Sequence, residues 1–585
     1  MPATKKGFIL LVSSILGVLI VGVGLWAGSL QTSSIIGTPP KGEIELIDSF
    51  PWQFKERGDA KLTAVFNPTS FTPPVWQIIP DDHLKKITIN GQTVDLSPYT
   101  QKQLKDYKQG FLLNISPYLK TGSNTAEFAF SNDPGPGGLK IYPKKSTLNW
   151  LIIYAGFLIF ALSLAKAVRL TGIQIAGLCI GLIVIIIYWS ETPWNLRSHD
   201  ADGLTGHFGY VRYIAENLSL PNPTKGWTFY HPPLYYASGA IIWRLAEASR
   251  IPPDIALQAY AITLWLIFLV TSLAALKRLL PPRSWALTAA SLALVLWPSG
   301  IIHSIRIGND AAYYAISGLA FLYGLKWWRT GKTSQALIVA FLCMLSLLVK
   351  SNGIVLCACM GTAVSVRFLL KGSWKKKKKT FYQALMIAGF SITGIILSSS
   401  VRIYFYLQGE MKHWLVGNLG SLNGALKVPN EIKAYIPIDI PTFITQPFIS
   451  TWVDETGRGN FWNFLLRSSL TGEFTFTSIP SAIIAVIWGI IILLLWFLAA
   501  RSIILARSFC WLKTYKNALW ILLFAYSIAS LAALRFMAPY ACSNDFRYIL
   551  PMLVPLVGYW GSIGKASRGS LLAISALSIA FFFTV

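Results

Sequence analysis

Two aspartates in the loop after a long apolar stretch are the residues of this chain best placed to do chemistry. Asp200 and Asp202 belong to the segment Arg197-Ser198-His199-Asp200-Ala201-Asp202. A carboxylate there can take the proton from a hydroxyl group as its oxygen attacks. Nearby cations stabilise a phosphate that departs in the same step. The pattern predicts transfer of a group from a phosphate-linked donor to a hydroxyl. The basic residues that also stand at the ends of apolar stretches, and could hold that phosphate, are Arg306, Lys350, Arg402 and Arg547.

The segment after the aspartates has the periodicity of a helix that lies flat on a membrane. Its apolar residues recur at helical spacing from Leu204 to Leu218, which suits a helix beside a lipid substrate. His207 lies at the edge of this apolar stripe, and packing is the favoured interpretation. His231 precedes two prolines and so lies at a fixed bend. A phosphate contact and a hydrogen bond at a helix start are equally open for it.

The elements that must position these residues are membrane-spanning helices. Hydrophobic residues make up 54% of the 585 and charged residues only 13%, too few to cover a soluble protein of this size. Apolar stretches long enough to cross about 30 Å of hydrocarbon predict about 13 spans. The clearest are 8–27, 172–189, 256–276, 284–302, 381–400, 481–500 and 569–585; the weaker are 151–165, 311–325, 334–349, 354–366, 518–534 and 549–563.

Charge distribution predicts the orientation of the chain. Basic residues cluster in alternate loops, including the run 375–379, which places the amino terminus in the cytoplasm. On this topology all 25 acidic residues fall outside, and the segment 232–247 is a short helix at the outer interface rather than a span. The net charge of +26 therefore indicates anionic membrane lipids as partners and no nucleic acid. We expect a plasma or inner membrane protein with an extracytoplasmic active site.

Residues 28–147, between the first two spans, are polar enough to form a separate extracytoplasmic β-sandwich. Residues 87–94 alternate around Asn90-Gly91, a strong hairpin signal, and 111–115 and 126–130 are further strand candidates. The pattern from Ile115 to Thr125 resembles galactose-binding-like jelly rolls, and it concerns a structural turn in that fold. A scaffold or docking role is favoured, with sugar or acceptor binding as the alternative. The six cysteines predict no disulfide framework.

Several loops on the predicted outer side resemble those of one enzyme superfamily. The first runs from the aspartates through the flat helix to Tyr230-His231-Pro232-Pro233-Leu234-Tyr235-Tyr236. The later ones are Arg306-Ile307-Gly308-Asn309-Asp310, Lys350-Ser351-Asn352-Gly353, Phe461-Trp462-Asn463 with Leu470-Thr471-Gly472-Glu473-Phe474, and Asp545-Phe546-Arg547-Tyr548-Ile549-Leu550-Pro551. Their order and shared side resemble the C-type glycosyltransferase superfamily, nearest its protein O-mannosyltransferase and aminoarabinose-transferase branch.

The resemblance covers most of the membrane part, residues 148–585, with a catalytic loop at 190–232 and a large outer loop at 401–480. It implies that Asp202 is the catalytic base. Because the Asp-Glu pair usual in the family is absent here, Asp200 remains the alternative. Together with the reading of the loops, it gives the substrate-binding set His231, His207, Tyr235, Arg306, Asp310, Lys350, Arg402, Glu473 and Arg547. Residues 1–27 would be an uncleaved transmembrane anchor.

The predicted function is an inverting glycosyltransferase that uses a polyprenyl-phosphate sugar and a protein, glycan or lipid acceptor. No cofactor is expected. Asp200-Ala201-Asp202 could hold a divalent metal, as in oligosaccharyltransferases, but a polyprenyl-phosphate donor does not require one. The alternatives are a flippase or transporter for lipid-linked sugars and a non-catalytic scaffold that presents the sandwich. A transporter should show paired repeats and ionisable residues at mid-membrane depth, and the sequence shows no convincing repeat.

Overall fold

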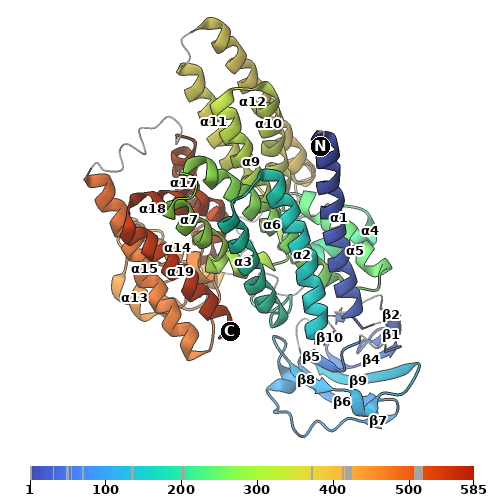
Figure 1. Ribbon diagram of the computed structural model, residues 1–585. Coiled ribbons are helices and arrows are strands. Elements are labelled where there is room, and N and C mark those ends of the chain that lie inside the picture. The colour runs from blue at the N-terminus through green and yellow to red at the C-terminus, as the bar shows by residue number, and fades with distance from the viewer. Residues whose placement is uncertain are drawn as a thin grey trace.

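A helical body and a lobe of strands make up the chain (Figure 1). The structure is a computed structural model and describes residues 3–30, 32–47, 52–54, 56–68, 72–133, 137–198, 204–370, 373–411, 414, 424–505 and 518–585. The strands lie beyond one end of α1 and α2 (Figure 1). The start of α12, which carries the run of lysines at 375–379, lies at the opposite end of the helical body (Figure 1).

Helices long and apolar enough to cross a membrane make this a membrane protein. Among the described residues six helices meet that description, and shorter apolar helices accompany them. The six are α1 (Ala3–Ala27), α2 (Thr147–Val168), α3 (Gly172–Ser190), α6 (Pro253–Leu279), α12 (Trp374–Leu407) and α15 (Ile479–Ile504). The shorter apolar ones are α10 (Thr333–Val349), α11 (Gly353–Leu369) and most of α17 (Ala518–Met537). The count of about 13 spans and the side on which each loop lies stay predictions.

Two stretches expected among the clearest spans differ from that expectation. Residues 284–302 form α7 (Trp285–Val295) and α8 (Pro298–Ser304), bent by 42°, which make a seventh candidate only if the pair is one span. The bend has a local cause, because Pro298 forces Trp297 into an extended conformation. The stretch 569–585 lies in α19 (Lys565–Phe582), which is not among the six. Its two basic residues and four serines lower its mean hydropathy.

The remaining described helices also belong to the helical body. They are α4 (His207–Asn217), α5 (Leu234–Ala248), α9 (Asn309–Thr330), α13 (Ile440–Thr445), α14 (Phe461–Thr471) and α18 (Leu553–Ile563). The 3₁₀ turns are η1 (Gln103–Lys105), η2 (Ser116–Tyr118), η3 (Gly424–Leu426), η4 (Ile432–Ala434), η5 (Asp454–Thr456), η7 (Ala541–Asn544) and η8 (Phe546–Met552). Residues 232–247, expected as a short helix, lie largely in α5.

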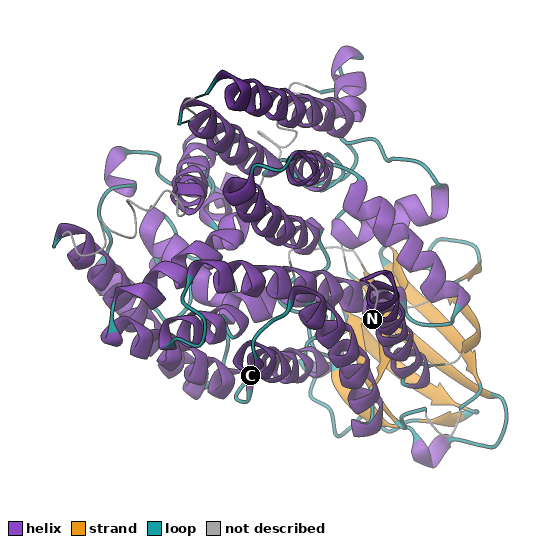
Figure 2. Cartoon of the chain, turned by 45° about the horizontal axis from the view of Figure 1, so that its top comes forward, coloured by secondary structure: helices purple, strands orange, loops and turns teal. Residues whose placement is uncertain are grey.

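Two antiparallel sheets form the strand lobe, drawn in orange in Figure 2. One has the order β2-β1-β4-β9-β6-β7 and the other β3-β10-β5-β8. Leu62 and Phe128 of the first sheet and Trp76 and Ile141 of the second share one buried core, so the sheets face each other as a sandwich. The strands are β1 (Thr32–Thr38), β2 (Glu45–Leu46), β3 (Trp52–Phe54), β4 (Gly58–Phe66), β5 (Val75–Asp81), β6 (His83–Ile89), β7 (Gln92–Thr93), β8 (Phe111–Asn114), β9 (Asn124–Asn132) and β10 (Gly137–Pro143).

The hairpin predicted around Asn90-Gly91 is confirmed. β6 pairs with β7 through Thr88 and Thr93, and both turn residues have positive φ, 50° for Asn90 and 82° for Gly91. A two-residue turn with positive φ at both positions matches the twist of the flanking strands. The strand candidates at 111–115 and 126–130 are also confirmed, in β8 and β9.

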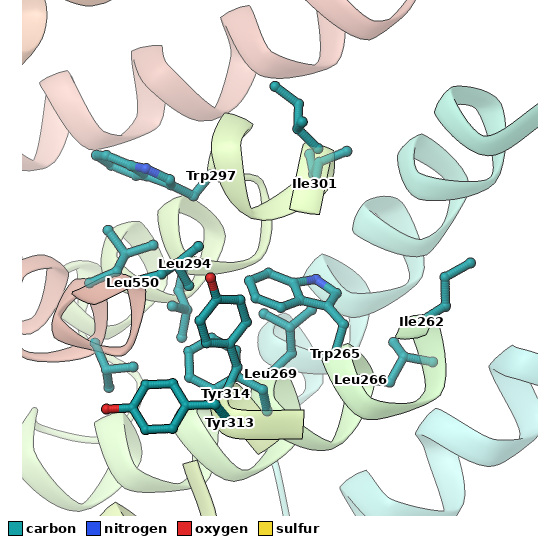
Figure 3. Packing of buried hydrophobic residues seen from close by; sticks show 14 of the residues in the cluster. Ile262, Trp265, Leu266, Leu269, Leu294, Trp297, Ile301, Tyr313, Tyr314 and Leu550 are labelled. Carbon is teal, nitrogen blue, oxygen red and sulfur yellow. The ribbon is translucent and has the colours of Figure 1, made fainter. Parts of the chain in front are cut away.

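A core of large aromatic side chains lies within the helical body. Trp265 of α6 and Tyr314 of α9 meet edge to face, with ring centroids 6.0 Å apart, and both are fully buried. Figure 3 shows them packed together with Leu550 of η8 close by. The Tyr314 hydroxyl donates a hydrogen bond of 2.7 Å to the carbonyl oxygen of Arg547. The apolar core therefore fixes the backbone at one of the predicted phosphate-binding residues.

The contact between α1 and α2 depends on two glycines. A Cβ at Gly17 would lie 2.7 Å from the carbonyl oxygen of Gly156, and one at Gly156 would lie 2.6 Å from the backbone nitrogen of Val21. Backbone atoms cannot rotate away, so only glycine allows this approach. Small residues bring membrane helices together in this way.

We predict that Gly17→Ala lowers the thermal unfolding midpoint of the detergent-solubilised protein, with a loss of about 1–3 kcal/mol from overpacking. Gly22→Ala on the same helix is the control, because nothing lies within 4 Å of a Cβ there. Equal midpoints for the two variants would contradict the close contact.

Candidate active site

A buried ion pair joins the start of α9 to the end of α10. The Lys350 ammonium contacts the Asp310 carboxylate, with the side chains 6% and 17% exposed. Asp310 stands in the first turn of α9, where the helix dipole favours a negative charge. The same ammonium lies 4.7 Å from the centre of the Tyr548 ring. A lysine held by one carboxylate and one ring still has hydrogen-bond donors for a further anion.

A second buried pair lies in the turn between η7 and η8. Arg547 Nε is 3.3 Å from Asp545 Oδ2, and the Asp545 side chain is fully buried. The other Asp545 oxygen accepts a 3.0 Å hydrogen bond from the Arg547 backbone and so starts η8. The Asn352 side chain donates a 3.1 Å hydrogen bond to the Tyr548 carbonyl, which ties this turn to the loop of Lys350. Glu473, after α14, is close enough to interact electrostatically with Arg547.

Two histidines stack on each other near these charged pairs. The rings of His207 and His231 are 5.5 Å apart and nearly parallel, and His207 Nδ1 is 2.7 Å from the Tyr236 hydroxyl. A Cβ at Gly308 would lie 3.6 Å from the His207 ring, an ordinary contact distance, so the start of α9 lies beside that ring. The Tyr235 hydroxyl oxygen accepts a 2.9 Å hydrogen bond from the Gly308 backbone. His207 is thus both a packing residue and a polar contact of the site.

Arg402 and Arg306 are two further buried arginines near this cluster. Arg402, near the end of α12, is 4% exposed, donates to the Ser399 hydroxyl at 3.0 Å and faces Tyr210 and Tyr230 electrostatically. Arg306 donates to the Leu196 carbonyl and, at 3.3 Å, to the Tyr188 hydroxyl. Arg306 therefore holds the loop that leads into residues 199–203.

Burial favours the neutral form of the titratable groups in the cluster, and it lowers the pKa of Lys350. It raises the pKa of Asp545 to about 7, although Arg547 opposes the shift, and it also raises the pKa of Glu473. Burial opposes the charge of Arg547, but Tyr548 and Asp545 hold its pKa well above the usual value. Burial lowers the pKa of His207 to about 3 and that of His231 well below its usual value, so both are neutral at pH 7. The cluster can thus bind an anion, with neutral imidazoles beside it.

The structure gathers side chains that the sequence analysis assigned to separate loops. His207, His231, Asp310, Lys350 and Arg547 interact electrostatically with one another, as do Glu473 and Arg547. Tyr235 and Arg306 support the neighbouring backbone, as described above. The two candidate bases, Asp200 and Asp202, lie outside the described residues. Thr228 donates from its backbone and its hydroxyl to the Thr205 carbonyl, which places the chain just after residues 199–203 beside the Tyr230-His231 turn.

Three site residues were not on the list drawn from sequence. Asp545 and Tyr548 flank Arg547 in the last motif, and the sequence signal for Asp545 was its place two residues before that arginine. Tyr236 belongs to the first loop motif, where nothing in the sequence distinguished its role from that of Tyr235. In the part of the chain that the structure describes, no three His, Cys, Asp or Glu residues form a group able to hold a metal ion.

Comparison of the chain with protein-family models found no match, and comparison with curated protein sequences found none either. The case for function therefore depends on the geometry of the site.

We predict that Asp310→Asn destabilises the protein by about 3–5 kcal/mol, because the buried Lys350 ammonium loses its counter-charge. The double variant Asp310→Asn/Lys350→Met should recover much of the loss, since both charges are then gone. Thermal unfolding in detergent measures both.

The matched control is Asp59→Asn, which breaks the exposed pair with Lys85 in the sandwich and should leave the midpoint almost unchanged. A double variant less stable than Asp310→Asn would show that the pair is not held by its charges.

Proposed function

We propose that the protein is a membrane glycosyltransferase that moves a sugar from a polyprenyl-phosphate donor to an acceptor hydroxyl on the extracytoplasmic face, with inversion. The observation that carries the proposal is the buried cluster of Lys350, Arg547 and Arg402 with Asp310 and Asp545. Its members come from helix ends and turns far apart in the sequence. Burying so many charged groups is costly, and their gathering at one place points to a charged substrate.

Sugar transfer from this donor needs a site that binds phosphate at the level of the lipid headgroups. Lys350, Arg547 and Arg402 supply three cations, and the raised pKa values of Asp545 and Glu473 reduce the negative charge opposing them. The polyprenyl chain would stay in the bilayer along α12, whose side chains Ile392, Ile396 and Leu397 are apolar and exposed. Arg402 stands on that same helix, within two turns of Leu397.

In the proposed step the acceptor oxygen attacks the anomeric carbon of the sugar. The bond from that carbon to the phosphate oxygen breaks, and its electron pair leaves with polyprenyl phosphate. Asp202 or Asp200 takes the proton of the attacking hydroxyl. Cations at the phosphate stabilise the negative charge that develops there. Attack from the face opposite the phosphate inverts the anomeric configuration.

We predict that Asp202→Asn or Asp200→Asn lowers turnover with labelled polyprenyl-phosphate sugars by a factor on the order of 10²–10⁴, the usual contribution of a general base. The other of the two substitutions should have a smaller effect. Arg402→Gln should instead raise the KM for the donor.

If neither aspartate variant changes turnover, the assignment of the base is wrong. If labelled donor crosses a proteoliposome membrane and no glycosylated product forms, a flippase replaces the transferase.

We predict that the KM for the donor rises as pH increases through about 7. Asp545 is protonated below that pH and ionises above it, where its carboxylate competes with the donor phosphate for Arg547. Asp545→Asn should keep a low KM and flatten the dependence between pH 6 and 8.5. A rise of the same size in this variant would exclude Asp545 as its source.

A further inference from the structure

A cavity of about 470 Å³ lies between the sandwich and the membrane helices, apart from the charged cluster. The sandwich contributes β5, β8, β10 and the turn around η1, and the helical body contributes the start of α2, the end of α3 and the start of α6. This volume falls within the range of about 300–1,000 Å³ that is usual for small-ligand sites.

Aromatic rings face the cavity from both walls. On the sandwich wall, Tyr99 and Phe111 pack with centroids 4.3 Å apart, and the Tyr99 hydroxyl is anchored to the Leu112 carbonyl at 2.8 Å. On the helical wall, Trp150 of α2 and Trp189 of α3 meet edge to face at 5.2 Å. A ligand with flat C–H faces fits between such pairs, because aromatic rings offer large apolar surfaces of fixed geometry.

The polar side chains of the lining are amides and balanced charges. Gln77, Gln103, Gln109 and Gln258 all border the cavity. Lys144 and Lys145 are matched by Glu191 and Asp254, and Lys144 pairs with Glu191 at 3.5 Å. A lining without a net charge and rich in amides favours a neutral ligand with many hydroxyl groups over a phosphate or an acyl chain.

One short loop contacts both the cavity and the candidate active site. Glu191 and Trp194 of this loop line the cavity, and the Leu196 carbonyl two residues on is held by Arg306. The Trp194 ring stacks on Phe208, 4.6 Å away, and Phe208 is the neighbour of His207. The same loop then runs into residues 199–203, the segment of the two candidate bases.

We propose that this cavity binds a neutral glycan, with sugar rings between the two aromatic pairs and hydroxyl groups beside the amide side chains of the lining. The bound glycan is the acceptor of the transfer reaction, a role that rests on the proposed function. The proposal also assigns a role to the sandwich, which forms one wall of the acceptor site.

The test is binding of the full-length protein in detergent to a glycan array that spans neutral and acidic oligosaccharides of two to six sugars. Wild type should bind a set of neutral glycans. Trp150→Ala and Tyr99→Ala should each weaken that binding at least tenfold. Gln109→Ala, an exposed side chain at the rim, should weaken it without disturbing the fold.

Two controls separate this proposal from the transferase proposal. Trp285→Ala removes an exposed tryptophan far from the cavity lining and should bind like wild type. Arg402→Gln should also keep full glycan binding, even though it impairs use of the donor. No binding to any neutral glycan, binding only to acidic glycans, or unchanged binding in all three cavity variants would overturn the proposal. Loss of transfer with intact glycan binding would instead count against the transferase mechanism alone.

Discussion

The burial of opposite charges at the ends of helices is the constraint on which this molecule depends. Removing an ion from water costs several kcal/mol, and the pairs Asp310–Lys350 and Asp545–Arg547 recover that cost only if their geometry is kept. The apolar core provides that geometry. Tyr314 holds the backbone of Arg547, and the start of α9 lies beside the His207 ring. The packed core of tryptophans and leucines therefore holds the residues of the polar cluster in position.

The same constraint explains the protonation of the site. Desolvation favours the neutral form of every group it reaches, so His207 and His231 remain uncharged and Asp545 titrates near neutrality. Arg547 keeps its charge because its partners outweigh the desolvation. Residues of one cluster thus have different protonation states in the same buried environment. The arginine stays charged and can bind an anion.

Local signals in the sequence predicted local structure well. Asn90-Gly91 gave the hairpin because a two-residue turn depends on its own residues alone. The loop motifs singled out Lys350, which directly follows an apolar stretch, and Arg547, which stands just before one. The number and continuity of the membrane spans were harder to predict from sequence. Pro298 bends one expected span, and serines in α19 lower the mean hydropathy of another. Asp545 and the cavity lined by Trp150 and Asp254 depend on contacts between distant segments, which no periodicity records.

The close packing of α1 against α2 has a consequence for the history of the chain. A Cβ at Gly28, just after α1, would lie 2.8 Å from the side chain of Lys145, just before α2. The strand lobe therefore leaves and rejoins the bundle at almost the same point. A segment with adjoining ends can be gained, exchanged or deleted in one event without pulling its host helices apart. The lobe is therefore built as an insertion between α1 and α2. A tight turn could join these two helices in its place.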